Sequence, residues 1–195
     1  MSYISPFRSN KTSSLKEAAA IIGGDVVRDC TFSGQGMFKT PDTNFLTVLY
    51  DEKYLPDFLS NIDNIAGVIC TKALEHHIPE STGCLVHDSP HDAFFNLQIH
   101  FCENDRGFLF NEIENQIHSD ATIHPSAVIA PRNVIIEAGV TIEANVVVMP
   151  YTYIGKNSYI GPNSTLGARG FEVRTINGKQ RYICLLYTSP SPRDS

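Results

Sequence analysis

The stretch "IGKNSYIGPNSTLG", Ile154–Gly167, states one six-residue unit twice and begins a third. Each complete unit opens with an aliphatic residue and a glycine, and its fifth member is a serine. Followed in both directions, the aliphatic residue recurs at steps of six, except for one step of seven between Ile129 and Ile136. The leading positions are Ile117, Ile123, Ile129, Ile136, Ile142, Val148, Ile154, Ile160 and Leu166. An internal repeat this short outweighs local propensity as evidence of fold.

The hexads predict a solenoid of triangular cross-section over residues 117–170, in which each unit forms one flat side and one corner. The leading aliphatic side chain is expected to point into a narrow prism, and the fifth member to remain small beside it. These fifth members are Ala121, Ala127, Asn133, Val140, Val146, Thr152, Ser158 and Ser164. Gly155, Gly161 and Gly167 are expected beside the corners, where backbone freedom is useful. A sandwich is the alternative, but its turns recur every ~8–12 residues.

Composition and charge narrow the class of protein. The net charge of -6 offers no basic surface, which argues against nucleic-acid binding and against attachment to an anionic membrane. The start lacks an export signal, and no apolar run approaches the length of a membrane-spanning helix. The five cysteines, odd in number and without a CxxC pair, are expected to be reduced: Cys30, Cys70, Cys84, Cys102 and Cys184. We therefore expect a cytoplasmic protein without stable membrane insertion.

The part before the hexads has a different character. After a polar lead-in, residues 1–12, Ser14 and Glu17 form a capping box that opens a helix in "SSLKEAAAIIGG". Strand-like runs such as "NFLTVLY" and "AGVICT" then alternate with helical runs such as "DEKYLPDFLSNID" and "SPHDAFFNLQIHFC". This alternation predicts an α/β domain over residues 13–103. Residues 104–116 are predicted to be a linker.

The hexad pattern resembles the left-handed parallel β-helix of the hexapeptide acyltransferases. The segments "SLKEAAAIIGGDVV", "NFLTVLYDEKYLPDFL", "IAGVICTKAL" and "GCLVHDSPHDAFFNL" follow in the order and spacing of one subfamily's first domain. "IHPSAVIAP" opens the repeats as it does there, and "LGARGFEV" resembles that subfamily's Gly-Phe loop. Over residues 13–183 the chain thus resembles the UDP-3-O-(3-hydroxyacyl)glucosamine N-acyltransferases of lipid A biosynthesis. The resemblance implies a left-handed β-helix, a loop over 171–183 and, in the full-length protein, a homotrimer.

The resemblance also implies a reaction. A 3-hydroxyacyl chain moves from the thioester of acyl carrier protein to the amine of a UDP-3-O-acylglucosamine, without a further cofactor or metal. In the family, the general-base histidine lies in an Ala-His-Asn-like hexad beyond the Gly-Phe loop. This chain contains no such hexad, so no catalytic residue is assigned. His118 and His124 are expected to be structural or solvent-facing, and five others lack catalytic or metal-binding spacing: His76, His77, His87, His91 and His100.

In the family, an aromatic residue, an asparagine three residues on and a tyrosine three further hold the uridine. The corresponding residues in "VLYDEKY" are Val48, Asp51 and Tyr54, which makes them the candidate substrate-binding residues. Tyr54 matches and can stack on a flat base; the alternative is that it faces the core. Asp51 offers only acceptors, and Val48 lacks the aromatic face, for which Phe45 and Tyr50 are candidate replacements. These departures favour a different sugar nucleotide.

Two other functions stay open. One is an acetyl-CoA-dependent sugar acetyltransferase of surface-polysaccharide synthesis, and the other is a non-catalytic sugar-nucleotide-binding module. The final stretch "CLLYTSPSPRDS", residues 184–195, resembles one reading frame of a sequencing adapter. We expect it to be a non-native tail in place of further repeats, so that the β-helix is truncated and the chain inactive. A genuine disordered tail is the alternative.

Overall fold

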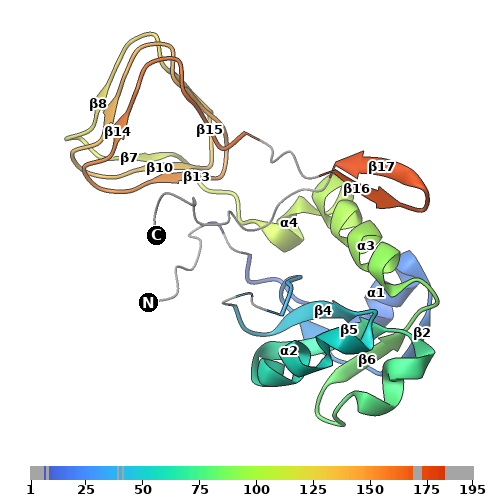
Figure 1. Ribbon diagram of the computed structural model, residues 1–195. Helices are drawn as coiled ribbons and strands as arrows, with labels where there is room; N and C mark the ends of the chain where they lie inside the picture. Colours follow the sequence, from blue (N-terminus) through green and yellow to red (C-terminus); the bar gives the residue numbers. More distant parts are fainter. Residues whose placement is uncertain (1–6, 8, 39, 41, 169–172, 183–195) are drawn as a thin grey trace. The chain divides into compact units, whose positions relative to one another are not determined.

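The computed structural model describes residues 7, 9–38, 40, 42–168 and 173–182, without the side chains of Arg106 and Tyr182. These residues form two compact units (Figure 1). Of the described residues, the first unit comprises 9–38, 40, 42–109 and 173–182, and the second comprises residue 7 and residues 110–168. Gly170 and Phe171 of the Gly-Phe loop, and the predicted tail at 184–195, lie outside the described residues.

A four-stranded mixed sheet forms the centre of the first unit. Its order is β2 (Asp25–Arg28), β6 (Gly83–Val86), β5 (Ile65–Cys70) and β4 (Phe45–Leu49). Strands β4, β5 and β6 are parallel to one another, and β2 is antiparallel to β6. Parallel strands are buried on both faces, which explains why "FLTVL" in β4 is apolar almost throughout and completely buried. A short antiparallel pair, β1 (Ser13–Ser14) with β3 (Thr31–Phe32), lies outside this sheet.

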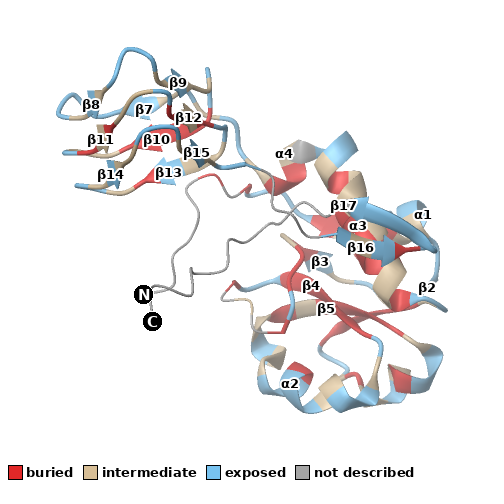
Figure 2. Ribbon diagram, turned by 45° about the horizontal axis from the view of Figure 1, so that its top comes forward, coloured by how far each residue is buried: buried red, intermediate tan, exposed pale blue. Residues whose placement is uncertain are grey.

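Helices pack on both faces of the sheet. Helices α1 (Leu15–Ile22) and α3 (Pro90–Asn104) contact the strands from one side. On the other side, α2 (Leu55–Ser60) buries Phe58 against Phe45 and Leu49. Short 3-10 helices flank α2 at Glu52–Tyr54 and Ile62–Asn64, and a third, Lys72–His77, connects β5 to β6. Figure 2 shows the buried strands between these exposed helical surfaces. Helix α4 (Arg106–Leu109) lies within the segment predicted as a linker.

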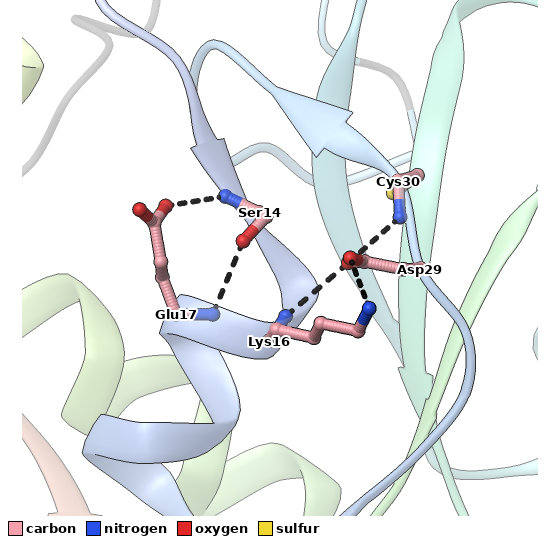
Figure 3. Close-up of polar contacts among 5 residues, drawn as sticks. All are labelled: Ser14, Lys16, Glu17, Asp29 and Cys30. Atoms are coloured by element: carbon pink, nitrogen blue, oxygen red, sulfur yellow. Dashed lines mark hydrogen bonds and ion pairs between the residues drawn. The ribbon is translucent and has the colours of Figure 1, made fainter.

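The predicted capping box is present at the start of α1 (Figure 3). The Ser14 hydroxyl accepts a hydrogen bond from the backbone N–H of Glu17 at 3.2 Å, and the Glu17 carboxylate accepts one from the N–H of Ser14 at 2.8 Å. Asp29 accepts hydrogen bonds from the N–H groups of Lys16 and Cys30, at 3.3 and 3.0 Å. The carboxylate of Asp29 therefore joins the turn after β2 to the first turn of the helix.

Two glycines make room for a thiol beside the sheet. Gly67 and Gly83 are register partners in β5 and β6, and the Cys30 side chain lies over both. A β-carbon on Gly67 would lie 2.7 Å from the Cys30 sulfur, and one on Gly83 would overlap the same sulfur more severely. Burial, and secondarily the charge of Asp29, raises the pKa of the Cys30 thiol to about 11. Cys30 is therefore a packing residue, with its thiol protonated at neutral pH.

Substituting Gly83→Ala should lower the free energy of unfolding by about 1–3 kcal/mol, because the added methyl group overpacks the space that Cys30 fills. In a Cys30→Gly background the same substitution should cost much less, since the overlapping atoms are gone. Urea denaturation of the four proteins in this cycle measures the coupling. Equal costs in both backgrounds would show that Cys30 is not the obstacle.

The second unit is a parallel β-helix of triangular cross-section (Figure 1). Its three sheets are β7-β10-β13, β8-β11-β14 and β9-β12-β15. The strands are β7 (Gln116–Ile117), β8 (Thr122–Ile123), β9 (Val128–Ile129), β10 (Val134–Ile136), β11 (Thr141–Ile142), β12 (Val147–Val148), β13 (Thr152–Ile154), β14 (Tyr159–Ile160) and β15 (Thr165–Leu166). Leading residues stack in register, Ile142 between Ile123 and Ile160, so three hexads complete one coil. The hexads and the stacked parallel strands fit the predicted left-handed β-helix.

The interior of the prism is as predicted. The leading residues of the central coil are nearly inaccessible, as are the fifth members Val140 and Val146. Where the fifth member is Ser158 or Ser164, its hydroxyl donates to the carbonyl of the residue three before it, at 2.7 Å in both cases. Each serine thus satisfies its own polar group within the turn.

Gly155 and Gly161 directly precede the turns, as predicted, but of the three glycines expected beside the corners only Gly167 has a positive φ, 71°. The left-handed residues instead lie three positions before the next leading aliphatic residue. They are Asn133, Gly139, Asn145, Tyr151, Asn157 and Asn163. The chain turns at this position, and asparagine tolerates the left-handed region better than most residues.

The one seven-residue step is held by two asparagine side chains. Asn133 is buried, and its side-chain oxygen accepts from the N–H of Ile113 at 2.7 Å. Asn115 donates to the carbonyl of Ala130 at 2.7 Å and accepts from the N–H of Val134 at 3.0 Å. These amides satisfy backbone groups where the extra residue interrupts the repeat.

A β-hairpin occupies the segment predicted as a loop, 171–183. Strands β16 (Val173–Ile176) and β17 (Lys179–Tyr182) are antiparallel and joined by Asn177 and Gly178, with φ of 50° and 71°. An Asn-Gly pair with two positive φ angles is typical of the type I′ turn. The hairpin belongs to the first unit and packs on α3 (Figure 1).

Candidate functional site

The candidate site lies where the parallel strands of the first unit end. Tyr50 follows β4 directly, and His91 lies in the first turn of α3, which follows β6. Their rings are in edge contact, with centroids 5.2 Å apart. Ligands of open α/β sheets bind beyond the carboxyl ends of the strands, so this edge is the first place to search for a pocket.

A pocket of about 240 Å³ opens at this edge, lined by Met37, Phe38, Tyr50, Tyr54 and Asp57. Tyr50 and Tyr54 meet edge to face, with centroids 5.3 Å apart and hydroxyl oxygens at 3.4 Å. Phe38 adds a third ring, 6.1 Å from that of Tyr54. Three aromatic side chains and one carboxylate suit a single flat ring that carries N–H or O–H donors. The pocket is too small for a complete sugar nucleotide.

The three predicted substrate-binding residues lie in different environments. Tyr54 lines the pocket while its ring also packs against the core. Asp51 accepts a hydrogen bond from the N–H of Lys53 at 3.0 Å, and its carboxylate lies 3.0 Å from the Lys53 ammonium; together these lower the pKa of Asp51. Val48 is fully buried in β4, so its side chain offers a ligand no surface. A role of these residues in substrate binding stays a prediction.

Of the two candidates for the missing aromatic face, Tyr50 lines the pocket and Phe45 lies fully buried in the core. Sequence reasoning missed Met37, Phe38 and Asp57. Asp57 follows Tyr54 by three residues, which places both on one side of a helix, and this spacing could have identified it. Met37 and Phe38 come from a connection without periodicity and gave no comparable signal.

Aromatic contacts continue from the pocket along α3. His91 lies between Tyr50 and Phe95, with a centroid distance of 4.9 Å to the latter, and the Arg174 guanidinium lies 4.8 Å above the Phe95 ring. The hydrogen bond with Tyr54 raises the pKa of Tyr50, and burial adds to the shift. The positive charges of Lys53 and Arg174 act in the opposite direction, so cations flank the aromatic pocket.

Three other histidines stabilise turns. The Nδ1 atoms of His118, His124 and His87 each accept from the N–H two residues on, at 3.1, 3.1 and 2.9 Å. Within the described ranges, no group of three histidine, cysteine, aspartate or glutamate side chains could hold a metal ion. The described part of the chain also has no helix of the length and apolarity needed to cross a membrane.

Comparison with known proteins adds one family. Residues 133–168 match the family described as bacterial transferase hexapeptide (six repeats). These residues lie within the β-helix, so the match supports the repeat architecture and a hexapeptide-repeat transferase in general. No curated protein sequence matches the chain.

Proposed function

We propose that the chain binds a UDP-sugar and acts in an N-acyltransferase of lipid A biosynthesis. The reaction would move a 3-hydroxyacyl chain from acyl carrier protein to the amine of a UDP-3-O-acylglucosamine, in a cytoplasmic homotrimer. One observation carries the proposal: a base-sized aromatic pocket, with Tyr50 and Tyr54 in its wall, lies in the unit that precedes a hexapeptide-repeat β-helix.

The pocket offers a base two kinds of contact. The Tyr50 and Tyr54 rings provide flat apolar surface, and stacking on one such ring contributes about 1–3 kcal/mol per base. The Asp57 carboxylate lines the same pocket and can accept from the imide N–H of uracil. Asp57 would then do what the family's asparagine does, while Asp51 stays paired with Lys53.

A second candidate is an acetyl-CoA-dependent sugar acetyltransferase. The burial of Val48 and the pairing of Asp51 with Lys53 favour a transferase outside the lipid A subfamily, because neither residue is then available for that subfamily's contacts with the base. Incubation of the full-length gene product with a UDP-amino sugar and either acyl carrier protein thioester or acetyl-CoA, followed by mass spectrometry of the sugar, separates the two. A full-length protein that binds the nucleotide and transfers from neither donor would be a binding module.

Tyr54→Ala should weaken the binding of uridine by about tenfold, since the stacking surface is lost. Tyr54→Phe should bind nearly as well as the wild type, because it keeps the ring. Isothermal titration of the 195-residue chain with uridine measures both. Tyr159→Ala, an exposed tyrosine of the β-helix, is the matched control and should bind like the wild type. Unchanged affinity in Tyr54→Ala would remove the pocket from the proposal.

A further inference from the structure

We propose that the β16–β17 hairpin is the phosphate-binding element of the nucleotide site, with Arg174 and Arg181 as ligands of the diphosphate. The inference rests on the proposed function, because it places the base of the same nucleotide in the Tyr50–Tyr54 pocket. It adds a second subsite, built from a segment that the sequence interpretation treated as a loop.

The two arginines share one face of the hairpin. Arg174 in β16 and Arg181 in β17 are direct register partners, and directly opposed residues of an antiparallel pair project to the same side. Ile176, two residues after Arg174, is 2% exposed and therefore marks this side as the one turned toward α3. Val173 and Thr175, which alternate with Arg174 and Ile176 along β16, are exposed and face the opposite side.

The guanidinium groups of Arg174 and Arg181 suit a phosphate, because each can donate two parallel hydrogen bonds to phosphate oxygens. The turn of the hairpin is attached to α3, because the N–H of Asn177 donates a hydrogen bond to the Asp92 carboxylate at 3.0 Å. That carboxylate also lies 3.4 Å from His91 Nδ1.

The arginine pair is continuous with the aromatic pocket. Arg174 stacks on Phe95, Phe95 contacts His91, and His91 contacts Tyr50 in the pocket wall. In Figure 1 the hairpin lies along α3, the helix that carries both Phe95 and His91. A nucleoside diphosphate has the matching order of parts, a flat base, a ribose and an anionic diphosphate. The local cations also contrast with the net charge of -6 of the chain.

The test compares uridine with UDP, which differ only in the phosphates. Isothermal titration of the 195-residue chain should show tighter binding of UDP, with a preference that falls as salt rises. Arg174→Gln and Arg181→Gln should each weaken UDP binding by about tenfold and leave uridine binding unchanged. Arg174→Lys should lie between, since it keeps the charge without the planar fork. Lys16→Gln, a cation on α1 paired with Asp29, is the control and should alter neither affinity.

The outcomes separate the two proposals. If uridine and UDP bound with equal affinity, the phosphate subsite would be wrong and the base pocket would remain. The same would follow if the arginine variants lost both ligands to the same extent. A wild-type chain that binds neither ligand would overturn the nucleotide function and this inference with it. Uridine affinity also reports whether each variant is folded. Arg174 stacks on Phe95, so a loss of UDP binding in Arg174→Gln that Arg181→Gln does not share would indicate a hairpin dislodged from Phe95, and would overturn Arg181 as a phosphate ligand.

Discussion

Replacing Ile142 with aspartate is expected to unfold the β-helix unit. Ile142 is 1% exposed and stacks between Ile123 and Ile160 in the prism, where it belongs to a cluster of buried apolar side chains. Removing such a side chain alone costs about 2–5 kcal/mol. The buried carboxylate adds a large desolvation cost without a partner, so the total should exceed about 4 kcal/mol.

Thr122→Asp is the matched control, because it introduces the same side chain at an exposed position of the neighbouring strand β8. It should change the free energy of unfolding by less than about 0.5 kcal/mol. Urea denaturation followed by circular dichroism compares the two variants, and amide exchange within β11 and β12 reports the β-helix unit by itself. If Ile142→Asp retained the protection of these amides, the assignment of Ile142 to the interior would be wrong.

The β-helix could be predicted in unusual detail because its period is a geometric requirement. One aliphatic side chain per flat side fills the prism, so the spacing alone identifies Ile136, Ile142 and Val148 as interior residues, and they are buried. The backbone freedom expected of Gly155 and Gly161 is not used, because other residues adopt the left-handed conformation at the turns. The left-handed positions are held mostly by asparagine, whose short polar side chain tolerates this conformation.

The candidate site could be predicted only where it is local in sequence. Tyr54 and Tyr50 are four residues apart and were both identified. Phe38 reaches the pocket from a separate connection, and Arg174 reaches the edge of α3 from the far end of the chain. No periodicity links such residues, since their proximity is a property of tertiary packing. The hairpin itself carried a usable signal, the Asn177-Gly178 pair, which favours a type I′ turn.

Asn133 lies at the seven-residue step of the repeat. Its side-chain amide should contribute more to the free energy of unfolding than the side chain of Asn163, another corner asparagine. In Asn133→Ala the N–H of Ile113 loses its acceptor, at a cost of about 1–3 kcal/mol. The alanine must also adopt a φ of 66°, which costs about 1–2 kcal/mol. The sum, about 2–5 kcal/mol, should appear as a loss of unfolding free energy and of amide protection at Ile113.

Two further variants separate these contributions. Asn133→Gly adopts the left-handed conformation freely, so it should lose mainly the contribution of the amide. Asn163→Ala, at an exposed corner with a φ of 61°, keeps the backbone problem but buries no unpaired N–H, so it should cost only about 1–2 kcal/mol. If Asn133→Gly were as stable as the wild type, the buried amide would contribute nothing, and conformation alone would explain asparagine at the corner. The expected order, with Asn133→Ala most destabilised, would instead show that a seven-residue step is tolerated because a side chain replaces the backbone bonds it interrupts.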